Sequence, residues 1–272
     1  MPSYLITGVS RGLGWEFLNQ LSTDANNTVI GIVRNKPVTD KKIAEAFAER
    51  SNITILEADL TSYDDLKRAS SDVATVTGGS LDYLIANGAY ITPFDAYDGL
   101  GTLIDKPQQL STEYHKMMDT NVLGNIYLFG VFIPLILKGK GRKVMTVTSG
   151  FGDIDWTNEL DLDMNALYSI SKAAVNMVTA KFNAQYKKDN VLFVSICPGF
   201  ADVDHPQEPP NEAQQAKLQE MFATITKYSP SFKGPDSPAL TVNTLLSVMD
   251  DCSIEKDDGG KVWSHFKNKR WL

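Results

Sequence analysis

Short apolar runs alternate with helix-like stretches along nearly the whole chain, and this alternation restricts the possible folds more than any other feature. The runs are almost continuously apolar, which is typical of strands buried on both faces of a parallel sheet. Strands are predicted at 4–7, 28–33, 53–58, 83–86, 143–148, 192–196 and 261–263. Helices are predicted at 13–21, 63–76, 112–137, 167–186 and 238–249. This order indicates an α/β fold with a doubly wound, seven-stranded parallel sheet and helices on both faces.

No internal repeat or linker divides the chain, so we expect one Rossmann-type domain over residues 1–272. In such domains a ligand binds beyond the carboxyl ends of the strands, at the point where the strand order reverses. The residues that directly follow the predicted strands are therefore the first candidates for a functional site.

Composition argues against several classes of partner. The net charge is −7 and no cluster of Lys and Arg occurs, so a nucleic-acid partner is not expected. The only cysteines are Cys197 and Cys252, which implies no disulfide framework and favours a reducing compartment. The N-terminus lacks the pattern of a secretory signal, and the most apolar stretch, 126–137, is too short to span a bilayer and contains Pro134. We expect a cytoplasmic protein without a membrane partner.

A glycine-rich turn at 7–14 follows the first predicted strand and leads into a helix. Gly8 allows a tight turn, Gly12 lets the backbone approach a pyrophosphate, and Gly14 lets the helix and strand pack closely. The N-terminus of the following helix offers unpaired N–H groups and partial positive charge to the phosphates. No Lys-Ser or Lys-Thr pair follows the last glycine, so the turn predicts a dinucleotide site and not a nucleoside-triphosphate loop.

The end of the second predicted strand favours NADPH/NADP+ over NAD. An NAD site normally places Asp or Glu here to bind the ribose 2′-hydroxyl, whereas a 2′-phosphate needs cations. In this chain the position is Val33, followed by Arg34, and Arg11 of the glycine-rich turn can approach the same phosphate from the other side. Two guanidinium groups are suitable charge-assisted donors for a phosphate dianion.

Tyr168 and Lys172 are four residues apart in a predicted helix and therefore share one face. A nearby ammonium favours the phenolate, so we expect the pKa of Tyr168 to fall from about 10 towards neutrality, as suits a general acid for carbonyl reduction. The strand at 143–148 delivers Ser149 to the same sheet edge, where its hydroxyl can hydrogen-bond a substrate oxygen. Asn121 lies in the helix predicted at 112–137, where Asn is unfavourable.

In their order and spacing, these motifs resemble the short-chain dehydrogenase/reductases over nearly the whole chain. The matching positions are Gly8 to Gly14, Asp59, Asn87-Gly88-Ala89, Asn121, Ser149, Tyr168 with Lys172, and Pro198-Gly199. The residues at 33–35 and the strand-like stretch at 259–262 look most like the carbonyl-reductase branch of that family.

The resemblance implies a role for each of these positions. Tyr168 would protonate the carbonyl oxygen as hydride leaves the nicotinamide, and Lys172 would lower the pKa of Tyr168 and hold the nicotinamide ribose. Ser149 would orient the substrate, and Asn121 would position a proton-relay water. The resemblance also assigns to the cofactor site Ser10, Leu13, Asn35, Asp59, Leu60, Asn87, Gly88, Pro198, Gly199 and Val203.

Three features depart from the family pattern. The usual Asn-Asn-Ala-Gly reads Ala-Asn-Gly-Ala at 86–89. The threonine usually found after Pro-Gly, a contact for the nicotinamide carboxamide, is replaced by Val203. Ser149 precedes Tyr168 by 19 residues (168 − 149), more than in many members, and the longer loop carries aromatic residues that are candidates to line a substrate pocket, Phe151 and Trp156.

A proline-rich stretch interrupts the strand–helix alternation, because seven of the twelve prolines lie between 198 and 238. One apolar helical face inside it is formed by Leu218, Met221, Phe222 and Ile225. The segment at about 202–236 is either a surface loop that packs a small helix on the core, or a substrate lid.

The function that these features favour is NADPH-dependent reduction of a ketone or aldehyde carbonyl on an apolar, aromatic or multi-ring small molecule. Two alternatives stay open: an NADP+-dependent alcohol dehydrogenase, because one site catalyses both directions, and a non-catalytic NADP(H)-binding sensor or scaffold. A hydrolase or a metal site is not expected, because Ser149 has no nucleophile-elbow motif and the histidines form no recognisable set, namely His115, His205 and His265. The resemblance further suggests a homodimer or homotetramer through the helices around 121–137 and 167–186.

Overall fold

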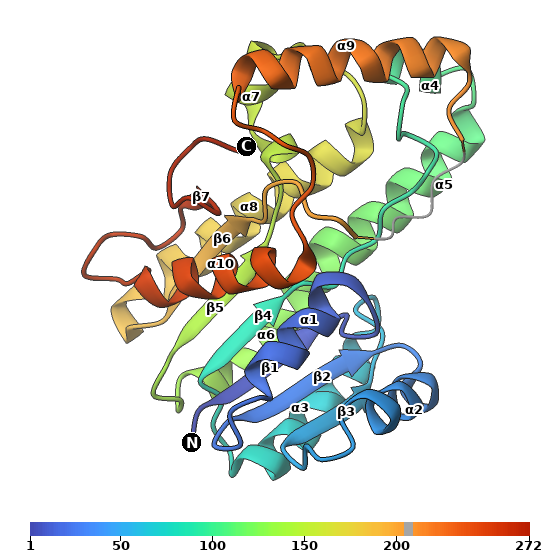
Figure 1. Cartoon of the computed structure of the whole chain (residues 1–272). Coiled ribbons are helices and arrows are strands. Elements are labelled where there is room, and N and C mark those ends of the chain that lie inside the picture. Colours follow the sequence, from blue (N-terminus) through green and yellow to red (C-terminus); the bar gives the residue numbers. More distant parts are fainter. Residues whose placement is uncertain (204–208) are drawn as a thin grey trace.

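The computed structural model describes residues 1–203 and 209–272 and contains one sheet of seven parallel strands. The strand order is β3-β2-β1-β4-β5-β6-β7 (Figure 1). Strands β2 and β3 are added on one side of β1, and β4 to β7 on the other, so the strand order reverses between β1 and β4. The strands are β1 (Ser3–Thr7), β2 (Thr28–Val33), β3 (Ile53–Glu57), β4 (Tyr83–Ala86), β5 (Lys143–Val147), β6 (Leu192–Cys197) and β7 (Val262–Ser264). The predicted doubly wound sheet is confirmed, and each strand lies within one residue of its expected bounds.

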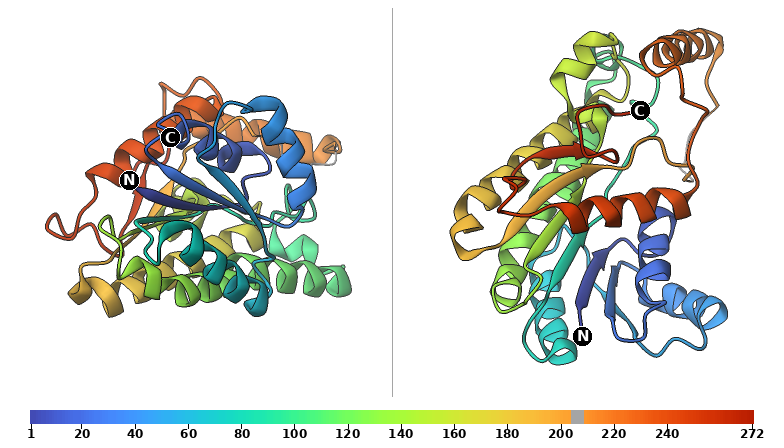
Figure 2. Two further views of the ribbon diagram at one scale, coloured as in Figure 1. Left: turned by 90° about the horizontal axis from the view of Figure 1, so that it is seen from below. Right: turned by 60° about the vertical axis from the view of Figure 1, so that its left-hand side comes forward.

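Helices cover both faces of this sheet (Figure 2). They are α1 (Gly12–Leu21), α2 (Lys36–Ala46), α3 (Tyr63–Thr77), α4 (Leu100–Leu103), α5 (Pro107–Met118), α6 (Gly124–Ile136), α7 (Ile154–Glu159), α8 (Ala166–Tyr186), α9 (Glu212–Tyr228) and α10 (Pro238–Asp251). Successive strand residues face opposite layers: Leu5 packs with α3, α6 and α8, and Ile6 packs with α1 and α10. Burial on both faces explains why the strands appear in the sequence as continuous apolar runs.

The helix predicted at 112–137 is longer and less regular than expected. It comprises α5, a π-helical turn η1 (Asp119–Leu123) and α6, which follow one another without a break. By length and composition, Pro107–Ile136 is the one helical stretch in the described residues that could cross a membrane. Half of its most apolar window is buried inside the protein, as for a helix that covers a sheet.

Two helices have sequences too polar for their apolar periodicity to predict them. In α2 the only buried residue is Thr39, and the helix starts because the Asn35 side chain accepts a hydrogen bond from the Val38 N–H at 3.1 Å. The short helix α7 starts in the same way at Asp153, which accepts from the Trp156 N–H at 2.9 Å. Capping residues, and not hydrophobic patterning, fix both starts.

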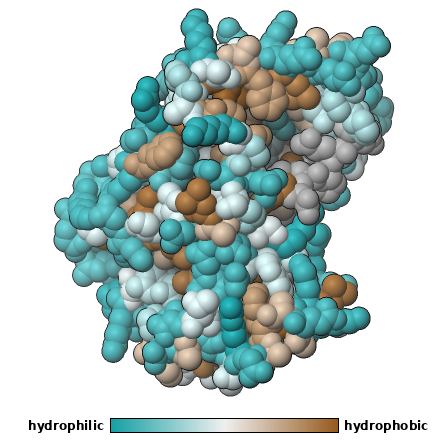
Figure 3. Space-filling view, in the orientation of Figure 1, coloured by the Kyte–Doolittle hydropathy of each residue, from teal (hydrophilic) through white to brown (hydrophobic). Residues whose placement is uncertain are grey.

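The carboxyl ends of the strands carry a separate upper layer that contains α4, α7 and α9 (Figure 1). Its apolar cluster includes Trp156 of α7, Ile225 of α9 and Trp271 near the end of the chain. The space-filling view shows apolar side chains gathered around α9, while most of the remaining surface in that view is hydrophilic (Figure 3). This layer overhangs the sheet edge at which a ligand is expected.

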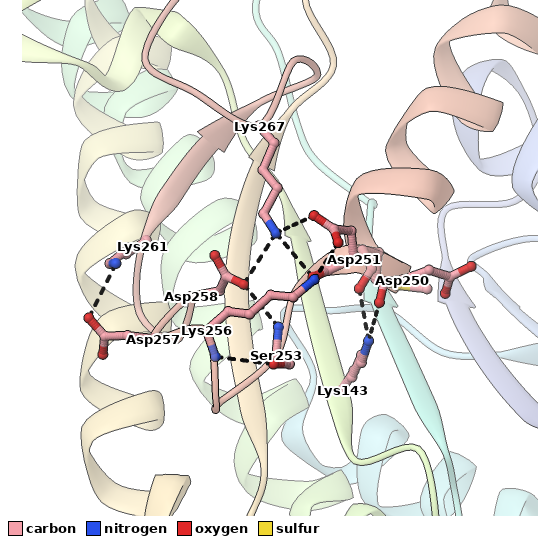
Figure 4. A network of polar contacts seen from close by, with 10 residues as sticks. Lys143, Asp250, Asp251, Ser253, Lys256, Asp257, Asp258, Lys261 and Lys267 are labelled. Atoms are coloured by element: carbon pink, nitrogen blue, oxygen red, sulfur yellow. Dashed lines mark hydrogen bonds and ion pairs between the residues drawn. The ribbon is translucent and has the colours of Figure 1, made fainter.

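A polar network joins α10 to the segments on either side of β7 (Figure 4). Asp251 accepts hydrogen bonds from Lys256 and Lys267, and these ammonium groups hold its pKa at about 2. Lys267 also lies 3.4 Å from a carboxylate oxygen of Asp258. The network links α10 to the segments that flank β7, the edge strand of the sheet.

Candidate active site

Tyr168 and Lys172 lie one turn apart near the start of α8. Nζ of Lys172 is 5.4 Å from the centroid of the Tyr168 ring, so the two side chains lie on one face, as their spacing predicted. The same ammonium donates a hydrogen bond at 2.8 Å to the backbone carbonyl of Val147, the last residue of β5. Lys172 is thereby buried at the carboxyl edge of the sheet, with 5% of its surface exposed.

The predicted lowering of the Tyr168 pKa is wrong for this structure. Burial raises the pKa of Tyr168 above its usual value of 10.0, and the hydrogen bond with the Ser149 side chain offsets this only in part. Burial also lowers the pKa of Lys172 to about 8, so this ammonium is itself easily lost. Desolvation is the largest influence on the pKa of both groups.

Ser149 lies two residues after the end of β5, and its side chain is close enough to Tyr168 to lower the pKa of that phenol. Its Oγ also accepts a hydrogen bond from the Phe151 N–H at 3.2 Å, which begins a 3₁₀ turn at 150–152. The structure therefore brings together Ser149, Tyr168 and Lys172 at the sheet edge, as the sequence analysis expected.

Asn121 lies in the π-helical turn η1 and is 1% exposed. Its Nδ2 donates to the Tyr90 carbonyl at 2.9 Å and to Ser171 Oγ at 3.1 Å, and its Oδ1 accepts from the Tyr90 N–H at 2.7 Å. Its backbone carbonyl accepts a hydrogen bond from Asn125 at 2.7 Å. The extra residue in this turn explains how a residue poorly suited to a helix is accommodated, and such turns occur often at functional sites.

Cys197 is a neighbour of this group that the sequence analysis did not identify. Its Sγ accepts a hydrogen bond from the Gly150 N–H at 3.1 Å. Burial raises the pKa of its thiol to about 11, so Cys197 is a neutral residue beside Tyr168 and Lys172. Within the described residues, no group of three His, Cys, Asp or Glu side chains could hold a metal ion.

The glycine-rich turn has the shape required for close approach to a dinucleotide. Gly8 has a φ of +76°, and a Cβ on Gly14 would lie 2.1 Å from the Gly8 carbonyl oxygen, so no larger residue fits there. Thr7 Oγ1 accepts hydrogen bonds from the N–H groups of Asn87 and Gly88 at 3.1 and 2.8 Å. These bonds place the ends of β1 and β4 together, where the strand order reverses.

Three cations belong to the turn or to segments near it. Arg11 directly precedes α1, Arg34 directly follows β2, and both residues are exposed. Nζ of Lys42 in α2 donates to the Ser10 carbonyl at 2.9 Å and lies 4.3 Å from the Trp15 ring centroid. Lys42 was not predicted, because no motif links α2 to the turn and only the fold brings them together.

The other positions assigned to the cofactor lie along the same edge. The Asp59 carboxylate accepts two hydrogen bonds from Thr61, both at 2.8 Å. Leu60 Cδ1 lies 3.1 Å from where a Cβ on Gly88 would be. Leu13 lies in the first turn of α1 and packs on the core.

The segment after β6 extends to the glycine-rich turn. Pro198 and Gly199 follow the strand, and Gly199 has a φ of +75°. Val203 Cγ1 lies 3.7 Å from where a Cβ on Gly12 would be, so this segment touches the glycine-rich turn. His205 and part of the predicted lid at 202–236 fall outside the described residues.

Aromatic residues of the upper layer stand next to Ser149. The rings of Phe151 and Trp156 are 5.7 Å apart, edge to face. A Cβ on Gly150 would lie 2.9 Å from Trp271, so the last described segment packs directly on the serine loop. On α9, Ile225 is buried whereas Phe222 is 43% exposed.

Comparison with known proteins identifies the family. Residues 3–214 match the family described as short chain dehydrogenase. The chain therefore belongs to the short-chain dehydrogenase/reductases, a family of oxidoreductases. It is 50% identical over 272 residues to the short chain dehydrogenase virK of Hypocrea virens, and the match covers 100% of both chains.

Other relatives and solved structures agree with this assignment. The short-chain dehydrogenase/reductase iacC of Pestalotiopsis fici is 44% identical, again over 100% of both chains. The carbonyl reductase Sniffer of D. melanogaster has the same fold, with a TM-score of 0.77 and 20% identity over 98% of each chain. An NADPH-bound carbonyl reductase from chicken fatty liver superposes with a TM-score of 0.76 and 20% identity, again over 98% of each chain.

Proposed function

We propose that this protein uses NADPH to reduce the ketone or aldehyde carbonyl of an apolar small molecule. The observation that carries the proposal is that Ser149 and Lys172 both lie beside Tyr168 at the carboxyl edge of the sheet. A pair of hydroxyls at this place can hold a carbonyl oxygen, and a partly buried phenol can give it a proton.

The chain's own residues would move the proton. NADPH, when bound, supplies a hydride to the carbonyl carbon. Ser149 donates a hydrogen bond that orients the carbonyl, and Tyr168 gives its phenolic proton to the carbonyl oxygen, which becomes the alcohol. The raised pKa of Tyr168 keeps this proton on the phenol until the oxygen becomes basic. The Lys172 ammonium then stabilises the phenolate, and a water held at Asn121 returns the proton.

The residues along the cleft fit NADPH. The turn from Gly8 to Gly14 and the start of α1 would hold the pyrophosphate. Arg11, Arg34 and Lys42 would bind the 2′-phosphate, since Val33 provides no carboxylate for a free 2′-hydroxyl. Of the proteins with this fold, the carbonyl reductase from chicken fatty liver is described as NADPH-bound, which supports the same cofactor here.

The remaining cofactor contacts are assigned by position along the sheet edge. Ser10 and Leu13 would contact the phosphates, Asp59 and Leu60 the adenine, and Asn87 and Gly88 the centre of the cleft. Pro198, Gly199 and Val203 would border the nicotinamide, and Asn35 would act by starting α2 beside Arg34.

The substrate would be apolar, because the wall next to Ser149 is aromatic. Phe151 and Trp156 form this wall, and Phe222 on α9 is exposed enough to contact a bound molecule. In this proposal 202–236 acts as a substrate lid. Exposed apolar residues on α6 and α8, Ile126 and Met177 among them, support a homodimer or homotetramer. The proposed location of the enzyme is the cytoplasm.

NADPH oxidation with a panel of ketones and aldehydes tests the proposal. Bulky aromatic ketones should be reduced, with one alcohol formed for each NADPH consumed. Oxidation of alcohols by NADP+ without carbonyl reduction under any condition would favour the dehydrogenase. Tight NADPH binding without turnover of any compound would favour the sensor.

A further inference from the structure

Asp95 is a buried carboxylate at the start of the catalytic helix, and no motif in the sequence identifies it. It lies in the segment after β4, and none of its surface is exposed. Its Oδ2 accepts hydrogen bonds from the Leu167 N–H at 2.7 Å and the Tyr168 N–H at 3.1 Å. We propose that Asp95 is a positioning residue that sets where Tyr168 stands relative to the cofactor cleft; the proposal rests on the proposed function.

The helix α8 depends on this carboxylate because its own first residue cannot cap it. Asn165 precedes the helix in the left-handed region, with a φ of +53°, and its side chain makes no capping bond to the described residues. In the helices that do begin with a side-chain cap, the cap is local: Ser62 caps α3, and Ser237 caps α10. For α8 the acceptor lies 72 residues away from Leu167 along the chain. The N–H groups of the first turn are thus tied to the loop after β4.

Further hydrogen bonds connect the first turn of α8 to the segment after β4. The Asp95 carbonyl accepts from the Asn165 N–H at 2.8 Å. Tyr90, five residues earlier, bonds to Asn121, which donates to Ser171 Oγ at 3.1 Å. The Ser171 hydroxyl in turn donates to the Tyr168 carbonyl at 2.8 Å. Both the N–H and the carbonyl of Tyr168 are therefore fixed through one segment at the edge of the cleft.

Keeping a carboxylate here is costly for the fold. Burial raises the pKa of Asp95, and Glu113 adds repulsion, while the two backbone N–H groups oppose this shift. Its second oxygen, Oδ1, has no hydrogen-bond partner among the described residues. A buried, half-satisfied acid is a poor way to stabilise a domain, whereas it is a good way to fix two N–H groups at one point.

Two substitutions separate position from charge. Asp95→Asn keeps an acceptor oxygen at the same place without the charge, and Asp95→Glu keeps the charge but moves the acceptor by one methylene. We expect Asp95→Asn to retain kcat within about fivefold, and Asp95→Glu to lose about a hundredfold in kcat, as a misplacement of about 1 Å can do. NADPH affinity should stay within about twofold in both, because the glycine-rich turn is untouched.

Amide hydrogen exchange provides a readout besides activity. Exchange at Leu167 and Tyr168 should stay slow in Asp95→Asn and become faster in Asp95→Glu. The control is Ser237→Ala. The Ser237 hydroxyl caps α10 by accepting a hydrogen bond from the Leu240 N–H at 3.3 Å, and the substitution removes this cap. It should speed exchange at Leu240 and leave kcat unchanged.

The outcomes distinguish the two proposals. If Asp95→Glu kept wild-type kcat, or if Asp95→Asn lost activity while its amides stayed protected, the positioning role would be overturned, although wild-type turnover would stand. If the wild-type protein reduced no carbonyl compound, the proposed function would fall, and the exchange at Leu167 would still show whether Asp95 holds the helix.

Discussion

Two lysines in different regions have opposite surroundings. Lys267 lies in the polar network beside β7, where hydrogen bonding to Asp251 raises its pKa (Figure 4). Lys172 lies under the Tyr168 ring, where burial lowers its pKa to about 8 and, in the described part of the chain, no carboxylate pairs with it. The first arrangement pairs the ammonium with two carboxylates, the exposed Asp251 and the buried Asp258. At Lys172 no carboxylate among the described residues offsets the free-energy cost of burying the ammonium. Buried groups with perturbed pKa values are typical of functional sites.

The comparison is sharpest when the same change is made in both regions. Lys172→Met removes the ammonium and keeps the bulk, so kcat/KM for carbonyl reduction should fall by about 10² to 10³. Stability should not fall, because an unpaired buried charge is removed. Lys267→Met is the matched control and should leave kcat/KM unchanged. Steady-state kinetics and thermal unfolding check both, and a Lys172→Met variant within tenfold of wild type would contradict the assigned role.

The pH dependence separates the two lysines further. The Lys172 ammonium is present below pH about 8 and is lost above it, so kcat/KM for reduction should fall above that pH, by about tenfold per unit. The folded pKa lies below the ordinary value of 10.5, so between these values the unfolded chain binds more protons. The contribution of Lys172 to folding stability therefore rises with pH across the window in which activity falls.

Kinetics and denaturation between pH 7 and 10.5 would test this opposition. Both trends should disappear in Lys172→Met and persist in Lys267→Met. A flat kcat/KM across this range in the wild-type protein would contradict the buried location of the ammonium.

Substitutions of the cations proposed to bind the 2′-phosphate should have a smaller effect than Lys172→Met. Arg34→Ala should weaken NADPH binding by about tenfold or more and change NADH binding by less than about twofold, because only the 2′-phosphate loses a charged donor. Lys42→Ala should act in the same direction. Arg142→Ala, next to the start of β5, is the control. Equal losses for both nucleotides, measured by fluorescence titration, would mean that these cations do not contact the 2′-phosphate.

The network should give the smallest effect. Surface ion pairs contribute little, so Lys267→Met should lower Tm by about 2 °C or less at low salt. The difference from wild type should vanish near 1 M NaCl, roughly the concentration at which salt screens exposed pairs. A large salt-independent loss of Tm would show that the network supports the fold more than its exposure implies.

The elements that the sequence predicted best are those specified locally. The five inner strands are mostly buried on both faces and must be apolar, so they could be located, whereas the edge strands β3 and β7 are only partly buried. The glycine-rich turn could be recognised because close packing at Gly14 admits no other residue. The spacing of Tyr168 and Lys172 reports a shared helix face without any knowledge of the fold.

What the sequence did not predict depends on contacts between distant segments. Asp95 meets its partners across 72 residues, and Lys42 reaches the glycine-rich turn only because α2 folds beside it. The direction of the Tyr168 pKa shift was wrong because the spacing shows the ammonium but not the burial, and burial is the larger effect.

Tyr168 is the proton donor of the proposed reaction, and one single-turnover experiment tests this role directly. Wild-type protein and Tyr168→Phe are each loaded with NADPH and mixed with a bulky aromatic ketone, and the alcohol formed per NADPH is measured. We predict one alcohol per NADPH for the wild type, and equal NADPH binding with no alcohol for Tyr168→Phe. Alcohol formation by Tyr168→Phe at the wild-type rate would contradict the account.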